Sequence, residues 1–404
     1  MKKYFIIAAA AVVAMAACSK NEIVDNGPGE KISFQVANYV PQTKATALED
    51  EFTSFKCKAY LHAEGYNLDG SYNTSESLGF QNFFGTSTTY TETVSYTFTD
   101  ANSNETKDAG EVTWKTAQDY YWPKSSHSFV NFVGWVGNTG TDPTVGYAWD
   151  ATASAYKATI AWPFTSTLGT ATQNLLYADM AWRFHSNNSP ATNASVSHVS
   201  EGVPMLFHHL LSKFCVKAYA VEKTVGTDPE ISTGTGTVTD GTATWTITFE
   251  DLTLGSINTA ATINLSNTDP GSSRSNYPQA WTQGDLTATT AGSLGPVAGA
   301  NAVSAVTSEN ANVLIAETCV IPQTIGSGVK LSGKVNIHTA YTNGASNNEK
   351  IPFEFTLNAM GTSAWAQNTI YTYILKVNPA QKLIYFDPAV DAPYTGVTGT
   401  EQAI

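Results

Sequence analysis

The sequence predicts an all-β protein, and three observations lead to that fold class. Threonine, which favours strands, makes up about one residue in eight. Apolar and polar residues alternate with a period of two in many segments. No long stretch of helical periodicity follows the first twenty residues. Hydrophobic residues are 42 % and charged residues only 14 % of the chain, so it can bury a large core.

The first twenty residues predict export. Lys2 and Lys3 precede an apolar run over residues 5–17 that is too short to span a bilayer as a stable helix. The run ends in Met-Ala-Ala before Cys18, which resembles the site where bacterial lipoproteins are lipidated and cleaved. We therefore expect a signal peptide over residues 1–17 and lipidation of Cys18. The alternative is an ordinary signal peptide in which this cysteine is incidental.

The strongest alternating segment near the start is residues 32–36. Its apolar residues are Ile32, Phe34 and Val36, and the polar residues Ser33 and Gln35 lie between them. Similar alternation over residues 94–98, 244–249 and 371–377 predicts further strands. We expect the core of the first half to contain five residues: Phe55, Cys57, Val130, Phe132 and Trp135.

The cysteine count argues against a disulfide framework. Once Cys18 is lipidated, three cysteines remain, and an odd number cannot all pair. Cys57 lies on the apolar side of an alternating segment, which favours a buried thiol. A bridge between Cys215 and Cys319 remains an alternative.

A polar stretch over residues 186–195 suggests a boundary. It is rich in Ser, Asn, Pro, Ala and Thr, and it divides the chain into parts of about 150 and 200 residues. Each part has the size of a β-sandwich domain.

The sequence contains no recognisable catalytic, metal or cofactor motif. His208 and His209 are adjacent, and neighbouring strand residues point to opposite faces, so they are a poor pair of metal ligands. Six of the nine tryptophans lie in the first half, where core packing explains them more simply than a sugar-binding platform. The formal net charge of −13 argues against a nucleic-acid binder. We expect no enzymatic activity, no cofactor and no metal.

Several segments together resemble the fimbrillin family, the Mfa-like lipoproteins that build type V pili in anaerobic Gram-negative bacteria. The resemblance spans nearly the whole chain, and the order and spacing of the segments carry it. The segments are the strand 31–36 after Cys18, the stretch 43–46, the strand 52–60, residues 121–123 with 130–135, residues 174–178 with 205–214, residues 320–323 and residues 365–373.

The resemblance implies two transthyretin-like Greek-key β-sandwich domains in tandem. It implies a propeptide with a removable first strand over residues 18–45, a first sandwich over 46–200, and a second over 201–404 with a C-terminal donor-strand tail. Fimbrillin precursors are cut by a protease, the first strand leaves, and a strand from a neighbouring subunit takes its place. The family's arginine-specific protease cuts after Arg, whereas this chain has Lys44. The sequence therefore does not identify the protease that would process it.

The site residues follow from this implied mechanism. We expect cleavage between Lys44 and Ala45, because the composition of the segment that contains this bond is typical of an exposed connection. Three residues form the removable strand: Ile32, Phe34 and Val36. Three others are donor-strand candidates: Val390, Tyr394 and Val397.

The resulting functional hypothesis is a structural pilin of a cell-surface type V fimbria that contributes to adhesion. Its expected partners are other fimbrial subunits, and it would reach the outer membrane through its lipid anchor. The alternatives are a tip or anchor subunit of the same fimbria and a non-polymerising surface lipoprotein that binds a host glycan or protein.

Overall fold

The structure is a computed structural model, and it describes most of the chain in separate ranges. These are residues 30–38, 52–62, 80–85, 90–101, 103, 112–123, 129–137, 142–169, 175–186, 197–199, 202–221, 237–239, 243–270, 279–305, 310–360 and 363–390. They contain strands β1 to β25 and one short 3₁₀ helix, η4 (Leu357–Met360). Within these ranges there is no helix with the length and apolar character to cross a bilayer. The predicted all-β class is confirmed.

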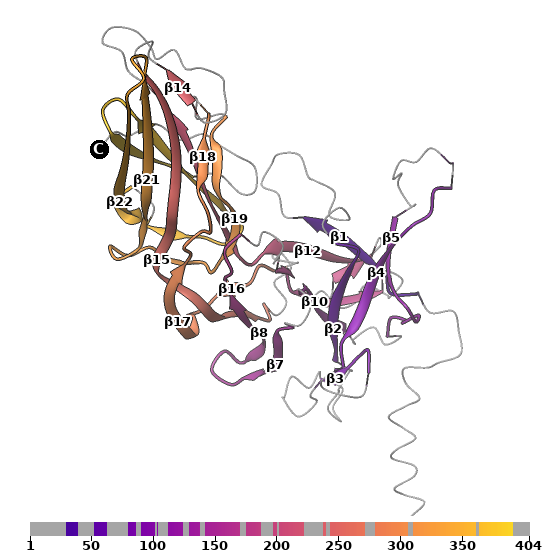
Figure 1. Ribbon diagram of the computed structural model, residues 1–404. Coiled ribbons are helices and arrows are strands. Elements are labelled where there is room, and N and C mark those ends of the chain that lie inside the picture. The colour runs from indigo at the N-terminus through magenta and orange to yellow at the C-terminus, as the bar shows by residue number, and fades with distance from the viewer. Residues whose placement is uncertain are drawn as a thin grey trace, which may run out of the picture.

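A ten-stranded sheet forms the first lobe, on the right in Figure 1. Seven of its strands close into a barrel because β2 pairs back with β6. Around the barrel these are β6 (Phe129–Val136), β9 (Leu176–Ala178), β12 (Val203–His209), β1 (Phe34–Asn38), β5 (Val112–Thr116), β4 (Glu92–Phe98) and β2 (Ser54–His62). The other three are β3 (Gln81–Asn82), β10 (Ala181–Ser186) and β11 (Ser197–Val199).

The barrel has an odd number of strands, and this fixes one feature of β1. Strands in a ring of seven cannot alternate direction all the way round, so at least one neighbouring pair must be parallel. Among the described barrel strands that pair is β1 with β12, and the other six pairs are antiparallel. The first strand of the chain therefore lies beside a strand that comes about 170 residues later.

Two facing sheets form the second lobe. The four-stranded sheet contains β19 (Asn312–Val320), β13 (Ser212–Ala220), β24 (Ile370–Asn378) and β25 (Leu383–Val390). The nine-stranded sheet runs through β22 (Ser346–Thr356), β21 (Lys330–Tyr341), β15 (Ala243–Thr268), β8 (Ala155–Thr165) and β7 (Thr144–Asp150). Shorter strands pair with β15, namely β14 (Thr237–Thr239), β16 (Thr282–Gln283), β17 (Thr287–Leu294) and β18 (Asn301–Val303). A separate two-stranded pair joins β20 (Gln323–Thr324) and β23 (Ala364–Trp365).

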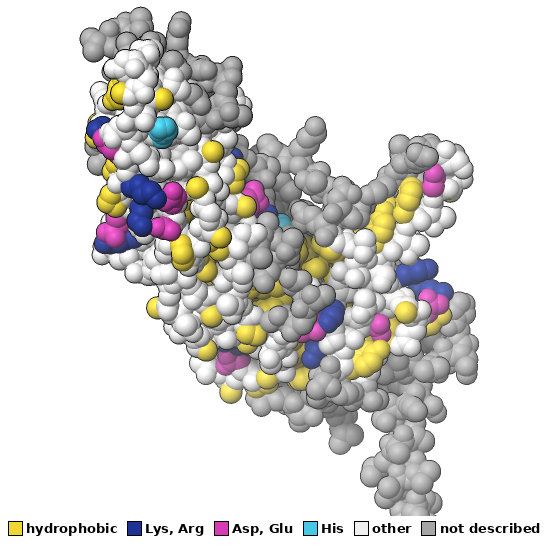
Figure 2. Space-filling model, viewed as in Figure 1, with side chains coloured by type: hydrophobic (Ala, Val, Ile, Leu, Met, Phe, Trp, Pro, Cys, Tyr) yellow, Lys and Arg dark blue, Asp and Glu magenta, His cyan; other side chains and the backbone are white. Residues whose placement is uncertain are grey.

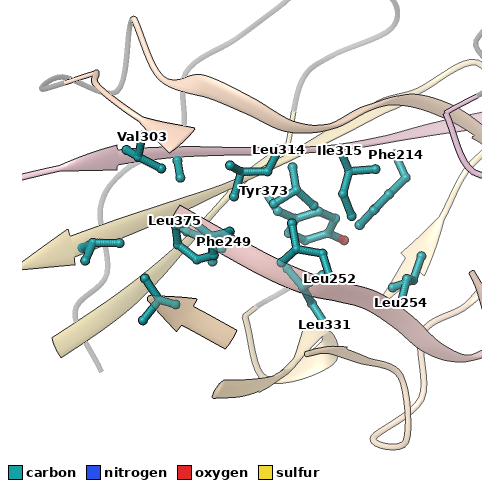
Figure 3. Packing of buried hydrophobic residues seen from close by; sticks show 14 of the residues in the cluster. Phe214, Phe249, Leu252, Leu254, Val303, Leu314, Ile315, Leu331, Tyr373 and Leu375 are labelled. Carbon is teal, nitrogen blue, oxygen red and sulfur yellow. The ribbon is translucent and has the colours of Figure 1, made fainter. Parts of the chain in front are cut away.

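Apolar side chains from both sheets fill the space between them. Figure 3 shows Phe214 and Tyr373 from the four-stranded sheet pointing toward Phe249 and Leu252 of β15. All four are buried, with Tyr373 only 1 % exposed. This arrangement is a two-sheet sandwich.

The 26-residue strand β15 joins the two lobes. Its first part pairs with β21, and its last part, from Ala260, pairs with β8. A third apolar cluster lies between this last part and the outside of the barrel, and it includes Trp135, Trp162 and Trp182. Along the chain, β7 and β8 belong to the same sheet as β15, although the barrel strand β12 lies between them and β15 in sequence. The chain therefore passes between the two sheets more than once.

The structure refines the predicted core of the first half. Phe55, Cys57, Val130 and Phe132 are buried inside the barrel as expected. Trp135 is also buried, but it packs in the cluster between the lobes. The first lobe also differs from the two-sheet sandwich implied by the resemblance, because its strands form one closed sheet.

The three cysteines within the described residues do not form a disulfide. Cys57, Cys215 and Cys319 are buried thiols, so the structure does not contain the alternative Cys215–Cys319 bridge. Burial raises the pKa of the Cys57 thiol, with a smaller contribution from the Glu92 carboxylate.

Candidate functional site

The site of interest is the position of β1 in the barrel wall. On one side β1 pairs with β12, from Phe34 opposite Val203 to Asn38 opposite Phe207. On the other side the ladder to β5 contains one residue pair, Phe34 opposite Trp114. β1 therefore closes the seam between β12 and β5, and it is held more extensively by β12.

Backbone hydrogen bonds extend the attachment before the strand begins. The Ile32 N–H donates to the Tyr120 carbonyl at 2.8 Å, and the Trp122 N–H donates to the Glu30 carbonyl at 3.0 Å. On the other side the Val203 N–H donates to the Ser33 carbonyl at 2.8 Å. Residues 30–33 thus act as a continuation of β1 across the same seam.

Alternate side chains of this segment enter the barrel core. Ile32 is 5 % and Phe34 4 % exposed, while Val36 is partly buried against the same cluster. Ser33 and Gln35 between them are exposed. The alternation read from the sequence therefore matches the burial, since successive strand residues point to opposite faces.

Phe34 makes the most specific contacts of the three. Its ring meets the rings of Phe55 and Phe132 edge-on, with both centroid distances 5.7 Å and interplanar angles of 85° and 90°. The Phe55 ring also packs against Trp114 of β5 and Phe207 of β12. The strands on both sides of the seam thus contribute rings to the cluster in which Phe34 packs.

Gly202 lets the backbone of β12 approach β1 closely. It has φ of +111°, and a Cβ placed there would lie 3.0 Å from the carbonyl carbon of Phe34 and 3.1 Å from the carbonyl oxygen of Ser33. Any larger residue would push against the β1 backbone. Sequence analysis did not identify Gly202, because its role depends on a strand about 170 residues away.

β12 contains a proline, Pro204, at a position where no ladder hydrogen bond is lost. The Val203 N–H faces β1, so the nitrogen of the next residue faces the opposite neighbour, β9. β9 pairs only with residues 207–209, so no ladder hydrogen bond is required of Pro204. The hydrogen-bonding edge of β12 toward β1 is therefore intact.

An ion pair lies at the start of the segment. Lys31 Nζ is 2.5 Å from Asp119 Oδ2, and both side chains are more than half exposed. The hydrogen bond to Asp119 raises the pKa of Lys31. Such exposed pairs add little to stability, so the buried side chains hold β1 in place.

Several predicted site residues lie outside the described residues. These are the signal peptide, Cys18, Lys44, Ala45, Tyr394 and Val397. Val390 is the last residue of β25, where it pairs with Tyr371. Lipidation, cleavage and strand donation therefore stay predictions.

The adjacent histidines occupy different environments. His208 Nε2 lies 2.9 Å from Asp179 Oδ1, whereas His209 is 3 % exposed on the other face of β12. Burial lowers the pKa of His209 to about 3, with smaller contributions from Lys213 and His208. Within the described residues no three His, Cys, Asp or Glu side chains are grouped to hold a metal.

Charged side chains occur in small mixed groups on the face shown in Figure 2, where uncharged polar and backbone atoms predominate. On the second lobe Lys334 pairs with Asp251 at 2.7 Å, and Lys350 pairs with Glu250 at 2.8 Å. A shallow pocket of about 440 Å³ beside them is lined by seven residues: Asp251, Ser332, Gly333, Lys334, Pro352, Phe353 and Glu354. The ion pair that lines this pocket, Lys334 with Asp251, is exposed, with side chains 49 % and 55 % accessible, so it does not form a buried catalytic cluster.

No family model and no curated protein matches the chain. Among solved structures, it is similar to a fimbrial protein from Bacteroides vulgatus, with 13 % identity, coverage of 90 % of this chain and 99 % of that one, and a TM-score of 0.46. It is also similar to a protein from Bacteroides uniformis described as a "putative cell adhesion protein", with 13 % identity, coverage of 92 % and 100 %, and a TM-score of 0.41.

A third similar structure is the fimbrial anchor protein Mfa2 from Porphyromonas gingivalis. The identity is 8 %, the coverage is 90 % of this chain and 99 % of that one, and the TM-score is 0.31. Each of these three solved structures is named as a fimbrial or cell adhesion protein.

Proposed function

We propose that this chain is a structural subunit of a cell-surface fimbria and that its precursor assembles by protease-triggered strand exchange. One observation carries the proposal. The first strand closes a seven-stranded barrel between β12 and β5, and it places Ile32 and Phe34 in the barrel core. A segment that precedes the rest of the barrel in sequence thus supplies part of its interior.

Loss of this strand would leave an unstable gap. The backbone edges of β12 and β5 would lose their hydrogen-bonding partners, and the core would lose two large apolar side chains. Each such side chain contributes about 1.5–3 kcal/mol through burial. Another strand entering the gap would restore both the backbone hydrogen bonds and the apolar contacts.

Strand exchange between subunits produces a filament. A subunit that accepts a strand at its barrel and donates one from its C-terminal end forms a head-to-tail contact, which does not close on itself. In this chain β25 lies at the edge of the four-stranded sheet, in the lobe away from β1 (Figure 1), and further residues follow Val390. The acceptor and donor regions therefore belong to different lobes.

The uncut chain would be a monomer in this mechanism. While β1 is covalently attached, it occupies the gap at a high effective concentration, and a strand from another subunit competes poorly. Cleavage between Lys44 and Ala45 removes that advantage. The lipid on Cys18 would hold the precursor at the outer membrane until the cut releases the body of the subunit.

A site-specific cut tests the proposal. A recognition sequence for a specific protease is inserted after Lys44 in the mature chain from residue 19, and the matched control carries the same residues in scrambled order. After protease treatment, mass spectrometry follows the loss of residues 19–44, and light scattering follows assembly. We expect the cut chain to form a ladder of oligomers and the control to remain monomeric.

Two results would contradict the proposal. One is a cut chain that loses its first segment and remains monomeric, which would favour a non-polymerising surface lipoprotein. The other is a scrambled control that polymerises equally well. A parallel comparison of wild type with Lys44→Ala, using the protein recovered from sheared surface fibres, tests whether the native bond is the one cut.

A further inference from the structure

We propose that the slot occupied by β1 selects its strand by an aromatic residue at the position of Phe34, with aliphatic residues two positions before and after it. This inference rests on the proposed function, because it specifies the kind of strand that a neighbouring subunit must donate. The chemistry of the slot, rather than the identity of any one partner, defines the pattern.

The central position is built for a ring. Phe34 is 4 % exposed and meets Phe55 and Phe132 edge-on at 5.7 Å, an arrangement that an aliphatic side chain cannot reproduce. Phe55 and Phe132 are themselves 1 % and 0 % exposed. Their rings belong to β2 and β6, which remain in the barrel when β1 leaves. The pocket for the ring thus belongs to the acceptor.

The flanking positions are less demanding. Ile32 is 5 % exposed and packs in the same apolar cluster, and its aliphatic side chain has no ring geometry to match. Val36 is only partly buried against the cluster. Ser33 faces outward and is exposed, so its identity should matter little. Selectivity should therefore be greatest at the centre.

The backbone contacts do not discriminate between sequences. Main-chain hydrogen bonds join Ile32 to Tyr120, Glu30 to Trp122 and Ser33 to Val203. Any extended segment could form them, so they give strength without selection. The aromatic pocket is therefore the feature that distinguishes one incoming strand from another.

The chain's own tail can place an aromatic residue at the central position in one register. Around its only aromatic residue beyond β25 the tail reads Ala392, Pro393, Tyr394, Thr395, Gly396. With Tyr394 at the centre, the flanking positions hold Ala392 and Gly396, which are smaller than Ile32 and Val36. Tyr394 should thus set the register of the tail, and the tail should bind more weakly than β1.

An exchange experiment tests the selectivity. The mature chain carrying the inserted protease site is cut, so that residues 19–44 remain as a non-covalent occupant of the slot. A peptide of residues 30–38 is added in excess, and native mass spectrometry measures how much of the segment it replaces. The peptide variants are Phe34→Leu, Phe34→Ala and, as a matched control at an exposed position, Ser33→Ala.

We expect the wild-type and Ser33→Ala peptides to exchange equally well, within about 2-fold. Phe34→Leu should compete about 10-fold less well because it loses both ring contacts, and Phe34→Ala about 100-fold less well or worse. A tail peptide of residues 388–398 should compete less well than the wild-type peptide. Its competition should fall further with Tyr394→Ala than with Val397→Ala.

The inference is overturned if Phe34→Leu and Phe34→Ala exchange as well as wild type, or if no peptide enters the slot at all. Its failure is distinguishable from failure of the proposed function. Aromatic-dependent exchange in a cut chain that never polymerises supports the selectivity and contradicts the fimbrial role. Polymerisation of a cut chain that takes up the Phe34→Leu and Phe34→Ala peptides as well as the wild-type peptide supports the fimbrial role and contradicts the selectivity.

Discussion

Arg183 on β10 and Asp269 just after β15 form a two-pronged ion pair between the barrel sheet and the nine-stranded sheet. Arg183 Nε donates to Asp269 Oδ1 at 2.8 Å and Nη2 donates to Oδ2 at 2.8 Å. The Asp269 side chain is 3 % exposed. The guanidinium also lies 4.9 Å from the centre of the Phe129 ring. Arg183 reaches this position with φ of +56°, where the β6–β10 register shifts.

Removing one member of this pair should be costly. Asp269→Ala leaves the Arg183 guanidinium mostly buried without its carboxylate, and we expect a loss of about 3–5 kcal/mol in the free energy of unfolding. Replacing both partners, as in Arg183→Met with Asp269→Leu, should cost much less than either single change. Urea unfolding measures all three variants. Equal losses in the single and double variants would show that the pair is not coupled.

Phe132→Ala should destabilise the barrel by about 3–5 kcal/mol. Phe132 is fully buried, and its ring packs against Phe34, Phe84 and Trp122. Val313→Ala on β19 is the control, because Val313 is 53 % exposed and should change stability by less than about 0.5 kcal/mol. Thermal and urea unfolding provide the measurement. An unchanged midpoint for Phe132→Ala would remove this residue from the core.

Gly202→Ala should loosen β1 without removing any of its side chains. The new methyl group would press on the backbone of Ser33 and Phe34. We expect faster amide hydrogen exchange in residues 32–36 than in wild type. Gly299→Ala is the control, since it also has a positive φ, +84°, but nothing lies within 4 Å of the new Cβ. Similar exchange of residues 32–36 in both variants would mean that the contact with β1 is unimportant.

Stability should fall as the pH decreases below 6.5. Burial lowers the pKa of His62 to about 3, and the Arg183 charge contributes to the shift. Between pH 6.5 and 3 the unfolded chain binds a proton at this histidine and the folded chain does not, so acid favours unfolding by up to about 1.4 kcal/mol per pH unit. Below pH 3 this contribution levels off.

Urea unfolding between pH 7 and 4 checks the histidine effect. His62→Gln should flatten the dependence of stability on pH, whereas Val313→Ala, which changes an exposed side chain that does not titrate, should leave it unchanged. His209 has a similarly lowered pKa of about 3, so His62→Gln should remove only part of the slope. A slope unaffected by His62→Gln would contradict the assignment.

Lipidation of Cys18 is expected from the sequence alone. Metabolic labelling with a palmitate analogue should mark the wild-type precursor and leave Cys18→Ala unlabelled. Cys18→Ala should also no longer be recovered with the outer membrane. Equal labelling of both proteins would contradict lipidation at this residue.

Local pattern was enough to predict several parts of this molecule. Alternation over residues 32–36 indicated a strand with Ile32, Phe34 and Val36 on one face, and the structure buries or partly buries those three side chains. The same reasoning identified Phe55 and Phe132 as core residues. Such predictions succeed because the side-chain period of a strand depends only on the backbone, and burial follows from polarity.

Trp135 shows where local pattern becomes insufficient. β6 is buried on both faces, so Phe132 points into the barrel while Val133 and Trp135 point into the cluster between the lobes. A sequence that is apolar on both faces carries no period to separate inside from outside. Only the packing of β8 and β15 against the barrel assigned Trp135 to its cluster.

The sequence by itself determined the all-β class, the strand that contains Phe34 and the faces of that strand. The tertiary structure decided that β1 lies parallel to β12, that Gly202 approaches its backbone, and that Arg183 meets Asp269. Each of these depends on two segments separated by at least 80 residues. Periodicity specifies which side chains a strand buries, whereas its partner strands are selected by the combined packing of the whole core, which no single segment encodes.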